Sequence, residues 1–215
     1  VINPSKYACI ARDKYLSHCL LDSLNIPKSE LYIYYNPQFA YNTDKLAFNY
    51  EGVVNIIKEK DIKQCVIKPS QDSAHGHGVI VFNNIEIADG KCLLKKFDGQ
   101  TIELNSLLGE QPLLFESFVK QSEQLASFNP SSVNTVRMMT ALYPNNEVKL
   151  IASFIKIGRA GSCVDNAGAG GNVDAAIDIN SGKLYNTLEF NSWHNIVTIT
   201  HHPDTHNPID GVVIK

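Results

Sequence analysis

The sequence lacks long apolar runs, paired cysteines and an excess of basic residues, and each absence excludes a class of protein. No apolar run approaches the roughly 18 residues that a membrane-spanning helix needs. The 19 Lys and Arg residues are outnumbered by 22 Asp and Glu residues, and the formal net charge is −3, so nucleic-acid binding has no electrostatic support. The five cysteines are widely spaced without a C-x-x-C pair, which predicts reduced thiols and a cytoplasmic protein.

Common catalytic signatures are also missing. The sequence has no G-x-S-x-G elbow, no H-E-x-x-H helix and no Walker-type phosphate loop. Three histidines, His201, His202 and His206, do gather around Asp204. A catalytic zinc site needs three ligands that converge on one point, and loop spacing does not show convergence. We therefore expect solvated loop histidines here rather than a metal centre.

The composition is that of a globular α+β protein. With 44% hydrophobic and 19% charged residues, the chain can bury a sizeable core. Apolar spacing predicts two early helices, whereas β-branched runs between turn residues predict strands that dominate the second half. The helices are expected over 13–24 and 50–60, and the strands over 31–35, 65–67, 79–82, 91–94, 112–119, 134–142, 148–157, 173–179 and 183–190. A change of character near residue 120 suggests two lobes.

Both ends of the chain look like cuts through a longer protein. The chain starts with Val1 rather than Met, and it stops at Lys215 directly after the apolar run 212–214. We therefore expect that part of the functional protein lies outside this chain.

The segment 65–82, CVIKPSQDSAHGHGVIVF, has the features of a phosphate-binding hairpin. Lys68 leaves the first strand just before Pro69, which cannot continue a sheet ladder. Gly76 and Gly78 let the backbone turn its N–H groups toward an anion. An ordinary mobile hairpin fits this stretch equally well when it is considered alone.

Two glutamates flank a polar change of direction after the apolar strand 112–119. A carboxylate within such a strand is costly to bury without a partner, so Glu116 could form a salt bridge with Lys68. The functional alternative makes this segment a nucleotide hinge. Backbone groups near Phe118 and Val119 would then read the adenine edge, and a carboxylate would hold the ribose hydroxyls.

Other charged residues surround a second glycine-rich loop at 158–172. Arg137 lies mid-strand, where it either forms an ion pair on the sheet or contacts a phosphate or carboxylate. Lys156 and Arg159 approach the loop, and Asp165-Asn166 lie inside it. Acidic and amide oxygens beside glycines can accept a metal ion, although such loops are more often plain turns.

Taken together and in order, these segments resemble the ATP-grasp superfamily, and most closely its sugar-transfer-associated branch, related to the α-L-glutamate ligases. The segments DKYLSHCLLDSLNIP, CVIKP, SAHGHGVIVF and ESFVKQSE resemble the first helix, the lysine strand, the glycine lid and the hinge of that superfamily. The segments SSVNTVRMMTAL, FIKIGRAGSCVDNAGAGGNVDAAIDINSGKL and HHPDT are the part most specific to the branch. The resemblance runs from about residue 12 to the end.

The resemblance implies an ATP-grasp fold, in which two lobes of mainly antiparallel sheet with flanking helices enclose a nucleotide cleft. It divides the chain into a helical and linker segment 1–60, a small lobe with the glycine lid 61–120, and the first part of a C-terminal lobe 121–215. It also implies that Glu116 and the Val119 backbone lie at the adenine and that Glu123 lies at the ribose. The full set of ATP-binding residues implied is Lys14, Lys68, His75, Gly76, His77, Gly78, Glu116, Phe118, Val119 and Glu123.

The chemistry implied is that of a ligase with ATP and Mg²⁺ as cofactors. A small-molecule carboxylate would attack the γ-phosphoryl group, and an amine or sugar-linked acceptor would capture the acylphosphate, in a role linked to cell-surface polysaccharide biosynthesis. Arg137 would steady the transferring phosphate, and the acceptor side would be lined by Lys156, Arg159 and Asn166. A kinase acting on a hydroxyl and a non-catalytic nucleotide-binding module are the alternatives.

The metal motif is where the sequence departs from the superfamily. ATP-grasp enzymes bind magnesium through an acidic residue on one late strand and Glu-x-Asn on the next. Glu189-Phe190-Asn191 has that spelling, and Asp174 or Asp178 precedes it. In the sugar-transfer-associated branch, however, this region precedes the metal motif. We therefore expect Glu189 and Asn191 to be an incidental hairpin feature and the metal ligands to lie beyond Lys215.

Overall fold

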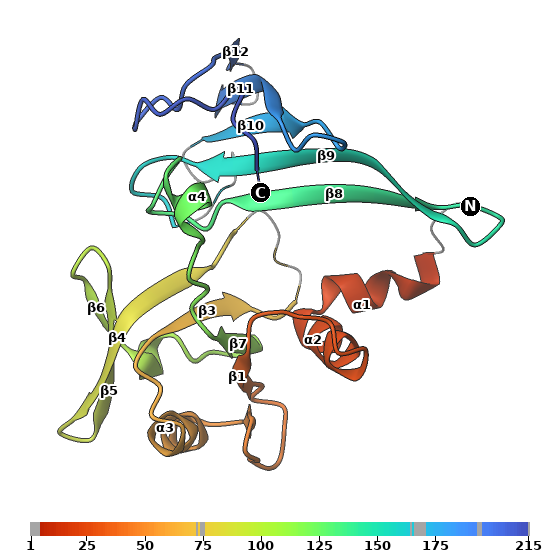
Figure 1. Cartoon of the computed structure of the whole chain (residues 1–215). Helices are drawn as coiled ribbons and strands as arrows, with labels where there is room; N and C mark the ends of the chain where they lie inside the picture. The colour runs from red at the N-terminus through yellow and green to blue at the C-terminus, as the bar shows by residue number, and fades with distance from the viewer. Residues whose placement is uncertain are drawn as a thin grey trace. The chain divides into compact units, whose positions relative to one another are not determined.

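The computed structural model describes residues 5–71, 73, 76–163, 165, 171–192 and 195–214. The chain divides into two compact units, Val1–Val119 and Lys120–Lys215, and each is described by itself (Figure 1). No helix among the described residues is long and apolar enough to cross a membrane.

The N-terminal unit is built on a seven-stranded sheet with the order β2-β1-β7-β3-β4-β5-β6. Every neighbouring pair is antiparallel except β1 with β2. The strands are β1 (Leu31–Tyr35), β2 (Leu46–Ala47), β3 (Cys65–Pro69), β4 (Ile80–Ala88), β5 (Lys91–Lys96), β6 (Thr101–Glu103) and β7 (Leu113–Glu116). The helices are α1 (Ala8–Arg12), α2 (Lys14–Ser23) and α3 (Tyr50–Glu59), with short 3₁₀ turns η1 (Ser5–Tyr7) and η2 (Leu104–Ser106).

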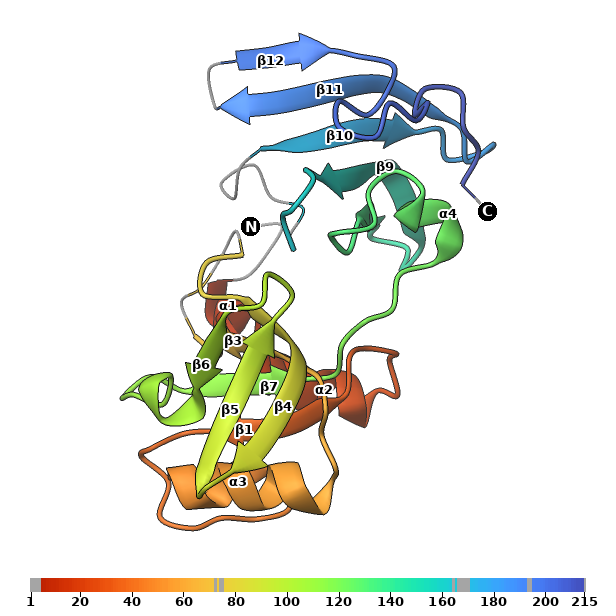
Figure 2. The same cartoon turned by 90° about the vertical axis from the view of Figure 1, so that its left-hand side faces the viewer.

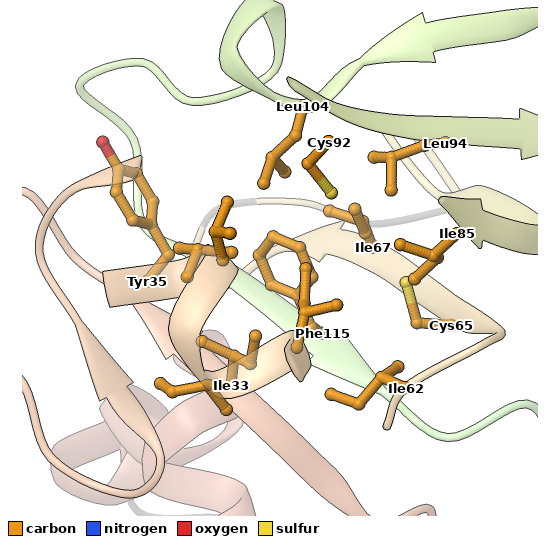
Figure 3. Packing of buried hydrophobic residues seen from close by; sticks show 14 of the residues in the cluster. Ile33, Tyr35, Ile62, Cys65, Ile67, Ile85, Cys92, Leu94, Leu104 and Phe115 are labelled. Carbon is orange, nitrogen blue, oxygen red and sulfur yellow. The ribbon is translucent and has the colours of Figure 1, made fainter. Parts of the chain in front are cut away.

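Helix α3 belongs to the larger hydrophobic core of this unit. It begins after Asn49, whose side chain accepts a hydrogen bond from the Gly52 amide and thereby caps the helix. Alternation along the strands points one set of side chains toward α3. Phe115 is 1% exposed and lies among aliphatic side chains and the buried thiol of Cys92 (Figure 3). The buried members of this cluster are Ile33, Tyr35, Ala47, Val53, Val54, Ile56, Ile57, Ile62, Cys65, Ile67, Phe82, Ile85, Cys92, Leu94, Leu104 and Phe115.

Helix α2 contacts the other face of the same sheet. Asp13 caps it, because its carboxylate accepts from the amides of Tyr15 and Leu16 at 2.8 and 3.2 Å. The Tyr15 ring stacks on Tyr34 of β1 with centroids 3.9 Å apart. A smaller apolar cluster of Leu31, Tyr34 and Leu114 therefore lies beneath α2.

The C-terminal unit is a five-stranded antiparallel sheet with the order β12-β11-β10-β9-β8. Figure 2 shows β12, β11, β10 and β9 in that order. Its core gathers on one face and includes Phe128, Ile155, Ile157, Val173 and Leu184. Its elements are α4 (Glu123–Ala126), β8 (Thr135–Leu142), β9 (Val148–Gly158), β10 (Asn172–Ile177), β11 (Leu184–Ser192) and β12 (Asn195–Thr198).

Two mainly antiparallel sheets with few helices confirm the predicted α+β class. The hairpin predicted at 65–82 is present, since Cys65, Val66 and Ile67 pair with Phe82, Val81 and Ile80. The strand expected over 148–157 is present as β9. Only the second half of β9 is largely covered, whereas Val148 and Ile151 are exposed, because the sheet extends there beyond its apolar core.

Candidate functional site

The start of α2 is attached to the loop that follows β3. The Lys14 amide donates to the Ser70 carbonyl at 2.9 Å, and the Asp13 carboxylate accepts from the side chains of Ser70 and Gln71 at 3.1 and 2.7 Å. The Lys14 ammonium donates to the Ser73 carbonyl at 3.0 Å. The structure therefore brings Lys14 to the same loop that the sequence assigned to phosphate binding.

The loop needs its glycines for conformation and for space. Gly76 and Gly78 have φ values of 77° and 73°, in the left-handed region that side chains disfavour. A Cβ on Gly78 would also lie 2.8 Å from the Pro69 ring. His77 is exposed, whereas His75 lies outside the described residues.

Replacing Asp13 by alanine tests how firmly α2 is joined to this loop. We expect the free energy of unfolding to fall by about 1–2 kcal/mol, because the helix cap and two side-chain contacts are lost together. Urea denaturation measures the change. Alanine at the exposed Asp44 is the control and should leave stability nearly unchanged; equal effects of the two substitutions would refute the attachment.

Glu116 is buried and paired with Lys68, the salt bridge considered from the sequence. Val66 lies opposite Glu116, and Lys68 lies opposite Leu114, so Glu116 and Lys68 are diagonal neighbours on one sheet face. The Lys68 ammonium is 2.6 Å from one oxygen of Glu116, and the His18 ring is 2.8 Å from the same oxygen. The Ser29 hydroxyl donates to the second oxygen at 2.7 Å.

The electrostatics of Glu116 follow from these contacts. Burial alone would raise the pKa of this carboxyl, but the hydrogen bond from His18 and the charge of Lys68 outweigh it and lower the pKa to about 2. Glu116 is therefore an ionised carboxylate at neutral pH. Sequence reasoning missed His18, because nothing local links it to a partner 98 positions away.

The remaining hinge residues follow β7. Phe118 and Val119 are 39% and 46% exposed and belong to the N-terminal unit. Glu123 is exposed in the first turn of α4, where Ser122 caps the helix, and belongs to the C-terminal unit. The structure thus leaves the side chains of these three residues accessible.

In the C-terminal unit, Arg137, Lys156 and Asp174 share one sheet face. Lys156 lies opposite both Thr135 and Asp174, and Arg137 is two residues beyond Thr135. Burial is the main cause that raises the pKa of Asp174 to about 6, against the lowering effect of Lys156. Two cations and a carboxylate that can hold a proton near neutral pH make this face suited to anion binding and proton transfer.

Polar side chains complete this face. The Thr135 hydroxyl donates to Asp165, and the Asn172 amide nitrogen donates to Asp174. The Asn172 amide oxygen is buried, and no hydrogen-bond partner for it occurs in the described part of the chain. Asn166, assigned to the acceptor side from the sequence, lies outside the described residues.

Arg159 joins a different set of residues. Its guanidinium contacts both oxygens of Asp204 at 2.9 and 2.8 Å, and it donates to Glu189 at 2.7 Å and to Asn191 at 3.2 Å. The hydrogen bonds and charge of Arg159 lower the pKa of Asp204. Arg159 therefore joins β11 to the loop that contains Asp204.

These contacts bear on where a magnesium ion could bind. Glu189 lies opposite Val173, the neighbour of Asp174, so Glu189 and Asp174 project from opposite faces of the sheet. The oxygens of Glu189 and Asn191 already accept from Arg159. Within the described ranges, no group of three or more His, Cys, Asp or Glu residues could hold a metal ion. This arrangement does not fit a magnesium site built from Asp174, Glu189 and Asn191.

The prediction of solvated loop histidines is wrong for His202. This ring is fully buried, and its Nε2 lies 3.0 Å from the Gly158 carbonyl oxygen. Its Nδ1 accepts from the amides of Asp204 and Thr205. Burial lowers the pKa of His202, which favours the neutral ring that these contacts need. His201 is exposed, as expected.

Two mainly antiparallel sheets, with Lys14, Lys68 and a glycine hairpin gathered in one unit, fit the ATP-grasp class. The family model for sugar-transfer associated ATP-grasp matches residues 1–215, so the chain belongs to that family. ATP-grasp proteins generally bind ATP and Mg²⁺ and act on small molecules. No curated protein and no solved structure matches the chain.

Proposed function

We propose that this chain is the ATP-binding domain of a ligase that joins a small-molecule carboxylate to an amine, linked to cell-surface polysaccharide biosynthesis. The observation that carries the proposal is that Lys14 contacts the loop that follows the Lys68 strand, in a chain of the ATP-grasp family. Two ammonium groups and backbone N–H groups around glycines are what a triphosphate requires.

In this proposal the N-terminal unit binds the phosphates and the base of the nucleotide. Lys14, Lys68 and the loop 75–78 hold the phosphates, and the backbone near Phe118 and Val119 reads adenine. The ribose is assigned to Glu123, a residue of the C-terminal unit. Glu116 is engaged by three side chains, which supports a role in orienting Lys68 rather than in touching the base. The fixed charges act mainly by positioning and by stabilising the developing charge.

The C-terminal unit would supply the reacting side. Arg137 steadies the transferring phosphoryl group, while Lys156, on the same sheet face, and the loop containing Asn166 line the acceptor side. Arg159 is left out of this set, because its guanidinium contacts Asp204, Glu189 and Asn191. Bound Mg²⁺ would neutralise charge on the phosphate oxygens. Because Glu189 and Asn191 contact Arg159, no step is assigned to them as metal ligands.

The reaction divides into two transfers. A carboxylate oxygen of the substrate attacks the γ-phosphorus, the bond to the β–γ bridging oxygen breaks, and ADP leaves. An amine then attacks the acyl carbon, inorganic phosphate leaves, and the amine loses a proton. Asp174, flanked by Lys156 and able to hold a proton near neutral pH, is a candidate to accept that proton.

The raised pKa of Asp174 also supports a second candidate function, that of a kinase that phosphorylates a hydroxyl. A carboxylate whose pKa lies near 6 can take the hydroxyl proton during attack on the γ-phosphate. The two enzymes differ in their products, since a kinase leaves a stable phosphoester, whereas a ligase turns over only when an amine is present.

The test is a titration of the protein with ATP and Mg²⁺, followed by measurement of ADP release with panels of carboxylates, amines and sugars. ADP release that needs both a carboxylate and an amine supports the ligase. Release with a hydroxyl substrate alone supports the kinase. ATP binding without ADP release across all panels would contradict both enzymes and favour a nucleotide-binding module, and absence of ATP binding would overturn the proposal.

A further inference from the structure

His18 is a buried residue with one unused ring nitrogen. It is 6% exposed in the middle of α2, and its Nε2 lies 2.8 Å from Glu116. Its Nδ1 is buried, and no hydrogen-bond partner for it occurs within the described ranges. Since Glu116 is a carboxylate that can only accept, Nε2 carries the hydrogen, and Nδ1 is the nitrogen that could take another proton.

Lys68 and His18 both contact the same oxygen of Glu116. Both contact Oε1, at 2.6 and 2.8 Å, and Ser29 occupies Oε2. Lys68 from β3 and Glu116 from β7 are the charged groups next to the Nε2 side of His18. On α2 itself, Lys14 lies one turn before His18 and Asp22 one turn after it, with Tyr15 and Cys19 as further titratable neighbours, and Asp22 is paired with Lys28 at 2.8 Å. A positive charge on Lys68 therefore opposes a second positive charge on His18.

We infer that His18 is the reserve counter-charge of Glu116, and that it takes up a proton from solvent when Lys68 turns toward the nucleotide phosphates. The inference rests on the proposed binding of ATP. The proton adds to Nδ1, so that an imidazolium replaces the ammonium beside Glu116 and the carboxylate stays paired. ATP binding is then coupled to the uptake of a proton, and His18 is a positioning residue for Lys68.

Physical constraints favour replacement of the Lys68 ammonium by a protonated His18 ring over a departure of Lys68 that leaves Glu116 without a cation. A buried carboxylate left without a cation is strongly unfavourable, so Glu116 needs a substitute charge. Lys68 can move, because its ammonium is on a flexible stem and its side chain is 23% exposed, whereas His18 is fixed in a capped helix.

The coupling can be tested without any nucleotide. Lys68→Met removes the ammonium and mimics its departure. We expect the NMR titration midpoint of the His18 ring to rise by roughly 1 pH unit or more in this variant. Lys91→Met, which removes an exposed ammonium paired with Glu103, is the control and should leave the midpoint in place. An unchanged midpoint in Lys68→Met would overturn the coupling.

The second measurement is calorimetric titration of the protein with ATP and Mg²⁺ near neutral pH, in buffers with different ionisation enthalpies. We expect wild type to take up a fraction of a proton, up to one per ATP, beyond the amount taken up by His18→Gln. Glutamine can donate to Glu116 but cannot be protonated. ATP binding with equal proton uptake in both proteins would overturn this inference alone. Absence of ATP binding would overturn the proposed function and the link to nucleotide, while the ring titration still decides the coupling.

Discussion

Replacing Phe115 by alanine is expected to lower the free energy of unfolding of the N-terminal unit by about 3–5 kcal/mol. The ring is 1% exposed and lies in the main core, on the strand that ends in Glu116 (Figure 3). Its removal deletes dispersion contacts and leaves a cavity that the surrounding strands cannot close. Urea denaturation followed by circular dichroism measures the loss.

Phe97 provides the control for this prediction. It is 62% exposed, and alanine there should cost less than about 1 kcal/mol. Phe115 directly precedes Glu116 on β7, so a shift of this strand after loss of the ring should also disturb the Glu116 pairings. A cost for Phe115→Ala no larger than that for Phe97→Ala would contradict the described core.

Glu116→Gln should remove a large part of the acid sensitivity of the N-terminal unit. The folded pKa of Glu116 is about 2, below its ordinary value of 4.5. A depressed folded pKa contributes stability that is fully present above the ordinary pKa and is lost as pH falls toward the folded pKa. The shift corresponds to about 3 kcal/mol that disappears between about pH 4.5 and pH 2.

The measurement is urea denaturation of wild type and Glu116→Gln at several pH values. At neutral pH the variant should be the less stable protein, because Lys68 and His18 lose their counter-charge. The difference should shrink as pH falls below about 4.5, since wild type loses the ionised carboxylate that the variant never had. A difference that stays constant down to pH 2.5 would show that Glu116 titrates normally.

Much of the fold could be predicted because its signals are local. Strand β1 and helix α3 follow from runs of β-branched and aromatic residues and from helical apolar spacing, and the hairpin of β3 and β4 follows from two apolar runs around a loop. The exposure of Val148 was not predictable in this way. It depends on how far the sheet extends beyond its core, which no local pattern records.

The same distinction between local sequence signals and tertiary packing applies to the residues of the candidate site. Lys14, Lys68 and the two loop glycines could be proposed as phosphate-binding residues, because their residue types and order resemble those of the ATP-grasp superfamily. The pairing of His18 with Glu116 could not, because it depends on packing of α2 against a strand distant in sequence. Arg159 was assigned to a substrate, but its contacts with Asp204, Glu189 and Asn191 also depend on tertiary packing.

The central claim is that Lys68 binds the phosphates of ATP, and titration of ATP and Mg²⁺ into wild type, Lys68→Ala and Lys91→Ala tests it most directly. Charge-assisted hydrogen bonds are worth about 1.5–3 kcal/mol, so Lys68→Ala should weaken ATP binding by roughly 10-fold to 100-fold. Lys91 lies in the same unit, and its alanine variant should bind ATP like wild type. Equal ATP affinities for wild type and Lys68→Ala would contradict the account.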